Sequence, residues 1–452
     1  MDVQSLQSAK VSVIGAARSG VGIARLMHAQ KAIVFVSDLE SRSKLSRWIS
    51  ELELLGVEYE TGGHSERVYD CALMVISPGV PSTAEVVLNA LRRNVRVVSE
   101  LEVASWFCPC PVVAITGSNG KTTTTTLVGR MLGDARIEHV VAGNIGTAFS
   151  TVVQQLKPPD TAVLEVSSFQ LDHIESFRPS VSVILNITED HMDRYEHSME
   201  KYSASKGRVF MNQHSTDILI YDADDLWTSR IVPRANCRTI PFSAKERLNE
   251  GAFVERGKLV TVLEGKRSSV IDVEEISIKG LHNLYNSMAA TLVAQLLGVS
   301  NASIRSTLRN FKGVEHRLEF VRELEGVRYI NDSKATNVDS VWYAVQAFKE
   351  PIVLLLGGRD KGNDYSRLAE IVVSRVKAVI AIGESASKVE SFFGSTVQTV
   401  VANSMEEAVQ EARRRAVPGD IVMLSPACAS FDWFENYEHR GKAFKEIVER
   451  LR

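Results

Sequence analysis

Short runs of apolar, often β-branched residues alternate with helix-length segments of mixed polarity from one end of the chain to the other. Such runs indicate strands buried on both faces, and their alternation with helices indicates βαβ units around parallel sheets. In the N-terminal part, strands are predicted over Val11–Ile14, Ile33–Val36, Ala72–Ile76 and Val95–Val98. A helix is predicted over Val21–Gln30, directly after the first strand and its turn.

The middle and C-terminal parts of the chain repeat this pattern. Further buried strands are predicted over Val112–Ile115, Ala162–Val166, Val181–Ile187, Tyr329–Ile330, Ile352–Leu356, Ala378–Ile382 and Ile421–Leu424. Residues 243–275 are charged and rich in turn formers, which predicts a peripheral hairpin region. Apolar residues recur at helical spacing from Leu281 to Leu297, and this stripe predicts a core helix.

The order of elements predicts an α/β protein of three domains, each a mostly parallel sheet with helices. We place the domains at residues 1–104, 105–312 and 313–452. Trp106–Pro111 contains two prolines, which interrupt regular structure, and is the predicted linker before the second domain. The chain has 452 residues, and at about 150 residues per domain this length suggests two to four domains, each able to bury a core.

Composition narrows the class of protein. The chain is 44% hydrophobic and 24% charged with a net charge of -3, which is typical of a globular protein and gives no electrostatic reason to expect nucleic-acid binding. The N-terminus lacks the apolar core of a signal peptide, and no uncharged apolar run reaches about 18 residues, so we expect no membrane span. The five scattered cysteines predict reduced thiols in the cytoplasm, and Cys108-Pro109-Cys110 has neither zinc-ribbon nor thioredoxin spacing.

The most informative stretch is Val112–Thr126, where a buried strand runs into a glycine turn and a helix start. The turn reads Thr116-Gly117-Ser118-Asn119-Gly120-Lys121-Thr122-Thr123. Glycines let backbone N–H groups approach a phosphate, and the helix N-terminus adds the positive end of its dipole. Lys121 would reach the outer phosphates of a nucleotide, and the Thr122 hydroxyl would face magnesium. Ile115 departs from the standard P-loop, which has a glycine there, and the alternative is an ordinary strand-to-helix turn.

A second glycine turn, Gly15–Gly20, follows the first strand, and Asp38 ends the next one. The arrangement is close to a dinucleotide-binding fingerprint, but Ala17 replaces the glycine that approaches the pyrophosphate. We therefore favour a different phosphate-bearing nucleotide over NAD, with Asp38 near its ribose or base. Ser77-Pro78-Gly79 ends the third strand and would add backbone donors at the same sheet edge.

Polar residues also follow the strands of the second domain. Glu165 lies in an apolar strand, and His191 follows the next strand. Ligands of open parallel sheets bind at the carboxyl ends of the strands, so both residues should share an edge with Lys121. A buried carboxylate needs a cation, and we favour magnesium for Glu165 over an internal ion pair. By spacing alone, Lys206 is expected on a solvated helix face.

The third domain has polar turns of the same kind. Asp332 and Lys334 flank a serine and could form either an internal salt bridge or the carboxylate and cation of a site. Asn283 and Asn286 mark the first turns of the predicted core helix, where polar residues either contact a ligand or cap the helix. Taken together, the residues predict an enzyme that uses magnesium and ATP to drive a transfer on a nucleotide-linked substrate.

Along nearly its whole length, the chain resembles the Mur ligase family. The shared motifs occur in family order and are ITGSNGKTT, AGNIG, LEVSSFQL, ITEDHMDRY, GLHNLYN, EHR and INDSKATN. The LLGGRDKG turn and the closing LSPACASFDWFENYEHRG resemble the members that add D-glutamate. The resemblance implies Rossmann-like N-terminal and C-terminal domains around a central domain of the P-loop ATPase type.

The resemblance also implies roles for individual residues. ATP would contact Gly117, Ser118, Asn119, Gly120, Lys121, Thr122, Thr123, Asn286, Arg317 and Asp332. The UDP substrate would contact Arg18, Ser19, Asp38, Gly79 and Asn144, and D-glutamate would contact Lys334, Thr336, Lys361, Ser430 and Tyr437. Two magnesium ions would be held by Thr122, Glu165, His191 and Lys206, the last as a carbamate formed with CO₂, which reverses its assignment to a solvated face. The catalytic residues would be Lys121, His191, Lys206 and Lys334.

The activity implied by the resemblance is ATP-dependent addition of D-glutamate to UDP-N-acetylmuramoyl-L-alanine, by a cytoplasmic monomer, in the peptidoglycan synthesis on which cell shape and division depend. ATP would phosphorylate the alanyl carboxylate, and the amine of D-glutamate would then displace phosphate. One alternative is another Mur ligase or a folyl-polyglutamate-type ligase that adds a different amino acid, including L-glutamate. Two others are a nicotinamide oxidoreductase, which leaves the P-loop unexplained, and a nucleotide sensor, which does not need the further strand-end carboxylates and lysines.

Overall fold

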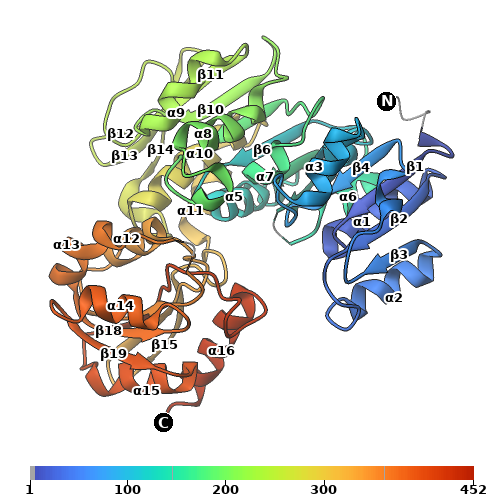
Figure 1. The fold of residues 1–452 in the computed structure, drawn as a ribbon. Coiled ribbons are helices and arrows are strands. Elements are labelled where there is room, and N and C mark those ends of the chain that lie inside the picture. The colour runs from blue at the N-terminus through green and yellow to red at the C-terminus, as the bar shows by residue number, and fades with distance from the viewer. Residues whose placement is uncertain (1–5, 145, 361) are drawn as a thin grey trace. The chain divides into compact units, whose positions relative to one another are not determined.

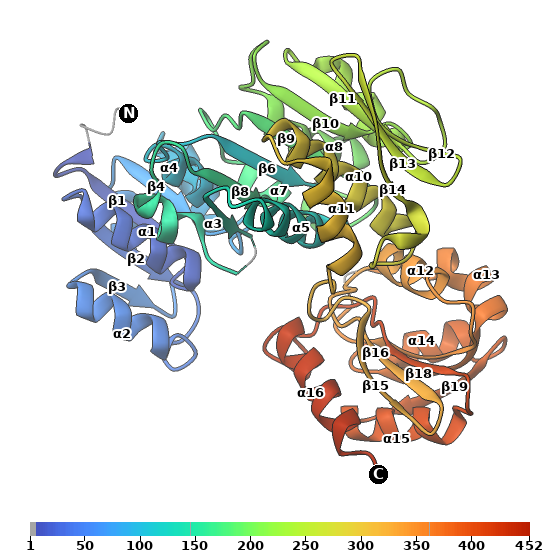
Figure 2. The same ribbon diagram turned by 180° about the vertical axis from the view of Figure 1, so that it is seen from behind.

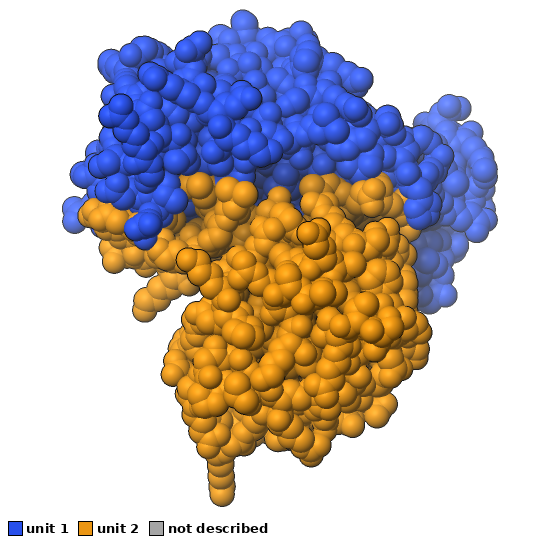
Figure 3. All heavy atoms as spheres, turned by 90° about the vertical axis from the view of Figure 1, so that its left-hand side faces the viewer, with its two compact units in different colours: residues 1–187, 194–274, 285–307 blue, residues 188–193, 275–284, 308–452 orange. Residues whose placement is uncertain are grey.

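The structure is a computed structural model that describes residues 6–144, 146–360 and 362–452 (Figures 1 and 2). The chain forms two compact units, which Figure 3 distinguishes by colour. Unit 1 holds residues 1–187, 194–274 and 285–307, and unit 2 holds residues 188–193, 275–284 and 308–452. Three mostly parallel sheets with helices, here named A, B and C, confirm the predicted α/β class.

Sheet A lies in unit 1 and has the strand order β3-β2-β1-β4-β5, with all neighbours parallel. Its strands are β1 (Lys10–Ile14), β2 (Ile33–Asp38), β3 (Glu58–Thr61), β4 (Leu73–Ile76) and β5 (Arg96–Ser99). The connecting helices are α1 (Arg18–Ala29), α2 (Ser46–Leu55), α3 (Glu85–Arg92) and α4 (Glu100–Ser105). Strand order reverses at β1, which pairs with β2 on one side and β4 on the other, so a crevice is expected where β1 and β4 end.

Sheet B also lies in unit 1, with the order β14-β13-β12-β11-β10-β9-β6-β8-β7. Its parallel strands are β6 (Val112–Thr116), β7 (His139–Gly143), β8 (Thr161–Glu165), β9 (Val181–Ile184), β10 (Ile218–Asp222) and β11 (Arg238–Ser243). The predicted hairpin region is confirmed, because each strand there pairs antiparallel with the next one in the chain. The strands are β12 (Gly251–Glu255), β13 (Lys258–Leu263) and β14 (Lys266–Asp272). Order reverses at β6, which lies between β8 and β9.

The helices of the middle part connect these strands. They are α5 (Lys121–Asp134), α6 (Phe149–Val152), α7 (Ser168–Leu171), α8 (Met199–Gly207), α9 (Leu226–Ile231), α10 (Leu281–Leu296) and α11 (Asn301–Asn310). Helix α10 confirms the helix predicted from the apolar stripe that begins at Leu281. Among the described residues, none of the helices is both long and apolar enough to cross a membrane.

Sheet C lies in unit 2 with the order β15-β16-β20-β17-β18-β19, antiparallel only between β15 and β16. Its strands are β15 (Glu319–Leu324), β16 (Val327–Asn331), β17 (Ile352–Gly357), β18 (Val376–Ile382), β19 (Gln398–Ala402) and β20 (Ile421–Leu424). The helices are α12 (Val338–Gln346), α13 (Ser366–Arg375), α14 (Ala386–Phe393), α15 (Met405–Arg415) and α16 (Tyr437–Arg450).

Strand β17 shows why the central strands read as unbroken apolar runs. Leu354 and Leu356 belong to one core cluster, whereas Val353 and Leu355 belong to another. Successive side chains of a strand point to opposite faces, so both faces of sheet C are covered and every position along β17 is apolar. The sequence analysis missed β3, a short edge strand whose polar residues are mostly half-buried and form no apolar run. It also missed the edge strand β19 and the interior strands β10 and β11 of sheet B.

Candidate functional site

The glycine turn after β6 adopts a backbone that its two glycines make possible. Gly117 has φ +152° and Gly120 has φ +85°, both in the region that disfavours other residues. A Cβ atom at Gly120 would lie 2.2 Å from Oδ1 of Asn286, and one at Gly117 would lie 3.0 Å from Cβ of Leu185. The turn therefore runs close to its neighbours and opens α5 at Lys121, with the helix N-terminus at the turn. This is the backbone arrangement of a phosphate-binding loop.

The loop after β9 holds this turn in place. Oδ1 of Asn186 accepts the N–H of Asn119 at 2.8 Å, and its Nδ2 donates to the carbonyl of the same residue at 3.1 Å. The carbonyl of Asn186 accepts the N–H of Ser118 at 2.9 Å. The hydroxyls of Ser118 and Tyr202 lie 3.1 Å apart. Sequence analysis did not single out Asn186 or Tyr202, because neither belongs to the glycine turn and only the sheet order brings them to it.

Two lysine ammonium groups meet at one carbonyl of the turn. Nζ of Lys121 donates to the carbonyls of Gly117 and Ser118 at 2.7 and 2.8 Å. Nζ of Lys206 donates to the Gly117 carbonyl at 2.9 Å and lies 4.6 Å from the centre of the Tyr202 ring. Lys206 is only 1% exposed, so its placement on a solvated face from spacing alone is wrong. The turn thus collects two positive charges where the phosphates of a nucleotide would lie.

A buried pair of oxygen donors lies at the start of α5. The Thr122 hydroxyl donates to Oε2 of Glu165 at 2.7 Å, and Nδ2 of Asn144 donates to Oε1 at 2.9 Å. Glu165 is 2% exposed at the end of β8, and Thr122 is buried as well. Oxygen ligands of this kind are those that magnesium prefers. The hydroxyl of Thr123 is buried without a hydrogen-bond partner among the described residues, which leaves it available to a ligand.

Asn286 of α10 also reaches the phosphate-binding turn. Its side chain is buried and accepts a hydrogen bond from the Thr124 hydroxyl at 3.3 Å. Because it lies against Gly120, the helix predicted from the apolar stripe presents an amide at the turn. The P-loop residues, Asn144, Glu165, Lys206 and Asn286 are thus brought together in unit 1.

A cavity of about 430 Å³ lies at the expected crevice of sheet A. The five residues assigned to the UDP substrate all line it, and these are Arg18, Ser19, Asp38, Gly79 and Asn144. Leu39, Val80 and Pro81 add an apolar wall, and His64, which the sequence analysis did not select, also lines the cavity. A mostly apolar cavity with a few polar groups is typical of a small-molecule site.

Asp38 shapes the glycine turn at this cavity. Its Oδ2 accepts the N–H of Ala16 at 2.6 Å, and its Oδ1 accepts the N–H of Glu40 at 2.8 Å. The Arg18 guanidinium, from the start of α1, hydrogen-bonds to the carbonyl of Gly146. Asp38 therefore holds the backbone of this turn at Ala16, and the Gly146 carbonyl holds its Arg18 side chain.

In unit 2, Asp332 directly follows β16 and accepts hydrogen bonds from two other segments. Its carboxylate accepts the Ser425 hydroxyl at 2.8 Å and the N–H of Leu318 at 3.2 Å. Burial raises the pKa of Asp332 to about 6, although the nearby Arg317 and Arg440 guanidinium groups oppose that rise. Nε of Arg317 is buried without a hydrogen-bond partner among the described residues. Asp332 and Arg317 are thus neighbours, and their assignment to ATP stays a prediction.

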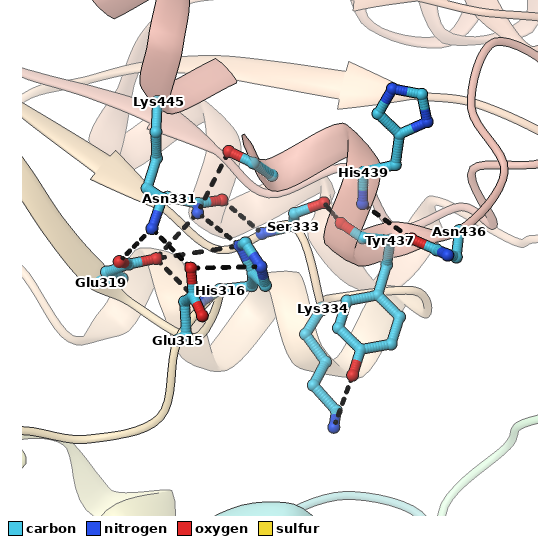
Figure 4. A network of polar contacts seen from close by, with 11 residues as sticks. Glu315, His316, Glu319, Asn331, Ser333, Lys334, Asn436, Tyr437, His439 and Lys445 are labelled. Carbon is cyan, nitrogen blue, oxygen red and sulfur yellow. Dashed lines mark hydrogen bonds and ion pairs between the residues drawn. The ribbon is translucent and has the colours of Figure 1, made fainter. Parts of the chain in front are cut away.

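Lys334, in the loop after β16, lies beside Tyr437 at the start of α16 (Figure 4). Nζ of Lys334 is 3.3 Å from the Tyr437 hydroxyl and 5.0 Å from the centre of its ring. Arg440, buried one turn further along α16, donates to the carbonyls of Ser333 and Cys428 at 2.8 and 3.0 Å. This arginine holds the loops after β16 and β20 together, which the EHRG motif did not indicate.

The remaining assigned residues are less fully described. Ser430 is buried and Thr336 is half-buried, each in one of these two loops. Lys361 lies outside the described residues. His191 belongs to unit 2, has φ +54° and lies 3.6 Å from the Asp190 carboxylate, so its relation to the phosphate-binding turn stays a prediction.

Two other clusters could suggest metal binding. Glu315, His316 and Glu319 lie close together, but the Lys445 ammonium bridges the two carboxylates at 2.7 and 2.8 Å and supplies the positive charge there (Figure 4). The sulfurs of Cys108 and Cys110 are 3.6 Å apart. Burial and the neighbouring thiol raise the pKa of Cys110 to about 12, which keeps it protonated and a weak ligand.

Comparison with sequence families finds three matches in chain order. The MurD N-terminal domain matches residues 10–86, the Mur ligase middle domain matches residues 115–294, and the Mur ligase glutamate ligase domain matches residues 316–428. UDP-N-acetylmuramoylalanine–D-glutamate ligase of Salinibacter ruber is 45% identical over 461 residues, covering 100% of both chains. The ligase of that name from Pelotomaculum thermopropionicum is 44% identical and covers 98% of each.

Solved structures share the fold at much lower identity. MurF of Acinetobacter baumannii matches with a TM-score of 0.65 at 16% identity, covering 99% of this chain and 98% of its own. MurC of Thermotoga maritima matches with a TM-score of 0.61 at 18% identity, covering 98% and 99%. Whole-length identity to named relatives, three domain matches in order and a phosphate-binding turn with its lysines and carboxylate lead to one conclusion: this chain belongs to the Mur ligase family.

Proposed function

We propose that this protein joins D-glutamate to UDP-N-acetylmuramoyl-L-alanine with the energy of ATP, in the synthesis of peptidoglycan precursors. The observation that carries the proposal is the phosphate-binding turn of unit 1, where Lys121, Lys206 and the Thr122–Glu165 pair converge. The substrates are those in the name of the relatives that match over the whole chain. The chain is accordingly an acid–amino-acid ligase with ATP as co-substrate.

The reaction has two balanced steps. An oxygen of the alanyl carboxylate attacks the γ-phosphorus of ATP, the bond to the β-γ bridging oxygen breaks, and ADP leaves. The amine of D-glutamate then attacks the acyl carbon, a C–N bond forms, phosphate leaves, and the amine loses a proton. Two anions meet in the first step, so the Lys121 ammonium group at the Gly117 carbonyl is positioned to offset the charge that gathers on the phosphoryl oxygens.

Magnesium fits the oxygens present at the turn. The Thr122 hydroxyl and the Glu165 carboxylate are both buried and 2.7 Å apart, which matches the preference of this ion for oxygen ligands. When bound, the ion would offset phosphate charge beside Lys121. For a second ion we propose His191 with Lys206, whose terminal amine becomes an oxygen donor if CO₂ converts it to a carbamate. The burial of Lys206 beside the phosphate-binding turn supports this assignment, because an oxygen donor there would lie close to the proposed phosphates.

The UDP portion is proposed to occupy the cavity of sheet A. Its volume of about 430 Å³ and its lining by Arg18, Ser19, Asp38, Gly79 and Asn144 support this assignment. Asn144 is both a lining residue and a hydrogen-bond donor to Glu165. The cavity and the phosphate-binding turn are therefore joined through one amide, which suits a substrate whose acid group must be phosphorylated at the turn.

The remaining assigned residues belong to unit 2 or, in the case of Lys361, lie outside the described residues, and we propose roles for them as well. Arg317 and Asp332 would contact ATP, and the proximity of these two residues supports a common ligand. Lys334, Thr336, Lys361, Ser430 and Tyr437 would bind D-glutamate, whose two carboxylates suit the two lysines. We retain the domain boundaries at residues 104 and 312 and propose that the protein acts as a monomer in the cytoplasm.

Phosphate release from ATP tests the proposed function. Purified protein with magnesium and UDP-N-acetylmuramoyl-L-alanine should release phosphate on addition of D-glutamate, with the amide product identified by mass spectrometry. L-glutamate and a panel of other amino acids should give far less, whereas a folyl-polyglutamate-type ligase would prefer L-glutamate. The Lys121→Ala variant should remain folded and lose this activity. Wild-type protein that leaves ATP intact with D-glutamate would refute the proposal.

A further inference from the structure

His64 follows β3 and lines the cavity of sheet A together with Asp38 and Gly79. It is half-buried, and Nδ1 of its imidazole lies 2.6 Å from the hydroxyl of Ser37, which is fully buried in β2. One edge of the ring is thus turned toward the sheet. Its other nitrogen, Nε2, makes no hydrogen bond to the described part of the chain.

The neighbours of Ser37 determine where the proton of His64 lies. The Ser37 hydroxyl donates to Oε1 of Glu60 at 2.7 Å, and the N–H of Ser65 donates to the same oxygen at 2.9 Å. Burial alone would raise the pKa of Glu60, but these hydrogen bonds outweigh it and hold the pKa below its usual value. Glu60 is therefore a carboxylate and can only accept hydrogen bonds.

A hydroxyl has one proton, and the acceptors near Ser37 are Oε1 of Glu60 at 2.7 Å and the carbonyl of Gly63 at 3.4 Å, of which the nearer carboxylate is favoured. The contact of 2.6 Å between Ser37 and His64 is then a hydrogen bond only if Nδ1 carries a proton and donates it to the Ser37 oxygen. Burial lowers the pKa of His64, although the carboxylates of Glu60 and Asp38 oppose this. The ring is therefore neutral near pH 7, with its proton on Nδ1 and a lone pair on Nε2.

The two charged side chains that line the cavity beside His64, Asp38 and Arg18, are engaged in holding the glycine turn. Both oxygens of Asp38 already accept backbone N–H groups, from Ala16 and Glu40. Arg18 is a donor and cannot accept. The contacts from Glu60 to Ser37 and from Ser37 to Nδ1 fix the orientation of the His64 ring. His64 therefore supplies Nε2 as a hydrogen-bond acceptor of fixed direction.

We propose that Nε2 of His64 accepts a hydrogen bond from the uridine moiety of the substrate, either from the imide N3–H of uracil or from a ribose hydroxyl. This inference rests on the proposed function, because it takes the occupant of the cavity to be a uridine nucleotide. His64 is then a residue that determines specificity. If its partner is N3–H, cytidine is rejected, because cytosine has an acceptor at that position and two lone pairs would face each other.

Binding of UDP alone, without ATP or turnover, tests the inference. Calorimetry would compare UDP with three analogues that each lack one donor, namely 3-methyluridine diphosphate, 2′-deoxyuridine diphosphate and 3′-deoxyuridine diphosphate. In wild-type protein, one analogue should bind about 3- to 10-fold more weakly than UDP, the loss expected for one neutral hydrogen bond. His64→Ala should weaken UDP by the same factor and abolish the preference over that analogue, while KM for ATP stays unchanged.

A matched control and a direct observation of the proton complete the test. His28→Ala removes an exposed histidine of α1 and should bind UDP as wild type does. ¹⁵N spectra of labelled protein should show His64 protonated on Nδ1, and Glu60→Gln should change that tautomer ratio. His64→Gln, which retains an acceptor oxygen, should recover part of the lost affinity.

Several results would overturn the inference. One is wild-type protein that binds UDP and all three analogues equally, which needs no variant to fold. Another is His64→Ala protein that is folded by circular dichroism and binds UDP within twofold of wild type. These failures differ from failure of the proposed function: turnover with D-glutamate would persist if only the role of His64 were wrong. Conversely, the expected binding pattern without any ATP turnover would leave the role of His64 intact and refute the ligase assignment.

Discussion

Replacing Glu165 by glutamine should show separately how this residue contributes to the stability of the protein and to the rate of turnover. Its carboxylate accepts the Thr122 hydroxyl through Oε2 at 2.7 Å and the Asn144 amide through Oε1 at 2.9 Å. Glutamine has nearly the same size but only one acceptor oxygen, and its NH₂ group must face one of these two donors. Because the site is 2% exposed, water cannot easily relieve that conflict.

The magnitudes follow from this geometry. One of the two buried donors would face the NH₂ group of glutamine and lose its acceptor. This loss should lower the free energy of unfolding by about 1–3 kcal/mol. The loss of the negative charge also removes a ligand proposed for magnesium, and the turnover number should fall roughly 10²- to 10³-fold, as for other single electrostatic contacts in transition states. The loss of rate should therefore exceed what partial unfolding of the protein could cause.

Steady-state phosphate release and chemical denaturation of the same preparations would measure both effects. Glu165→Asp retains the charge and should lose less activity than Glu165→Gln. Glu175→Gln is the matched control, because this glutamate is partly exposed, pairs with Arg96 and should affect neither quantity by more than about 1 kcal/mol. If folded Glu165→Gln protein turned over within about threefold of wild type, the assignment of Glu165 to the reacting phosphates would be refuted.

Three further variants probe the rest of the site. Burial raises the pKa of Asp332 from 3.8 to about 6, so the folded state binds this proton more tightly than the unfolded state; stability should fall by up to about 3 kcal/mol as pH rises from about 4 to 6, and urea unfolding of Asp332→Asn should lack that slope. Tyr437→Phe removes the hydroxyl 3.3 Å from the Lys334 ammonium, and should raise KM for D-glutamate about threefold with kcat nearly unchanged, whereas an unaltered KM would exclude this contact from substrate binding. Lys206→Ala should nearly abolish phosphate release, and added acetate or formate should restore part of it; normal turnover would rule out the carbamate.

Local pattern was sufficient for much of the fold. The strand before the phosphate-binding turn, the glycines of that turn and the apolar stripe of α10 are short-range features, and each was found where the sequence predicted it. The polar clusters after β1, β4, β6 and β8 were also placed correctly at strand ends. This worked because parallel strands expose their carboxyl ends at one edge, so a residue that follows a strand is committed to that edge by topology.

Side-chain environments depended on contacts between segments far apart in the chain. Lys206 lies on a short polar helix. Nothing in the spacing of that helix shows that the Lys206 ammonium donates to the carbonyl of Gly117, 89 residues away in the sequence. Likewise, Asn186 and Arg440 are ordinary polar residues in sequence, and their roles come from the loops they hold.

The amino-acid sequence thus determined which segments become strands and helices and which chemical groups follow each strand, because backbone preference and the burial of apolar runs act over a few residues. The tertiary structure alone decided the state of those groups. Whether a lysine is buried, which carboxylate a threonine contacts and which nitrogen of His64 carries the proton all depend on neighbours that only the folded sheets bring within hydrogen-bonding distance.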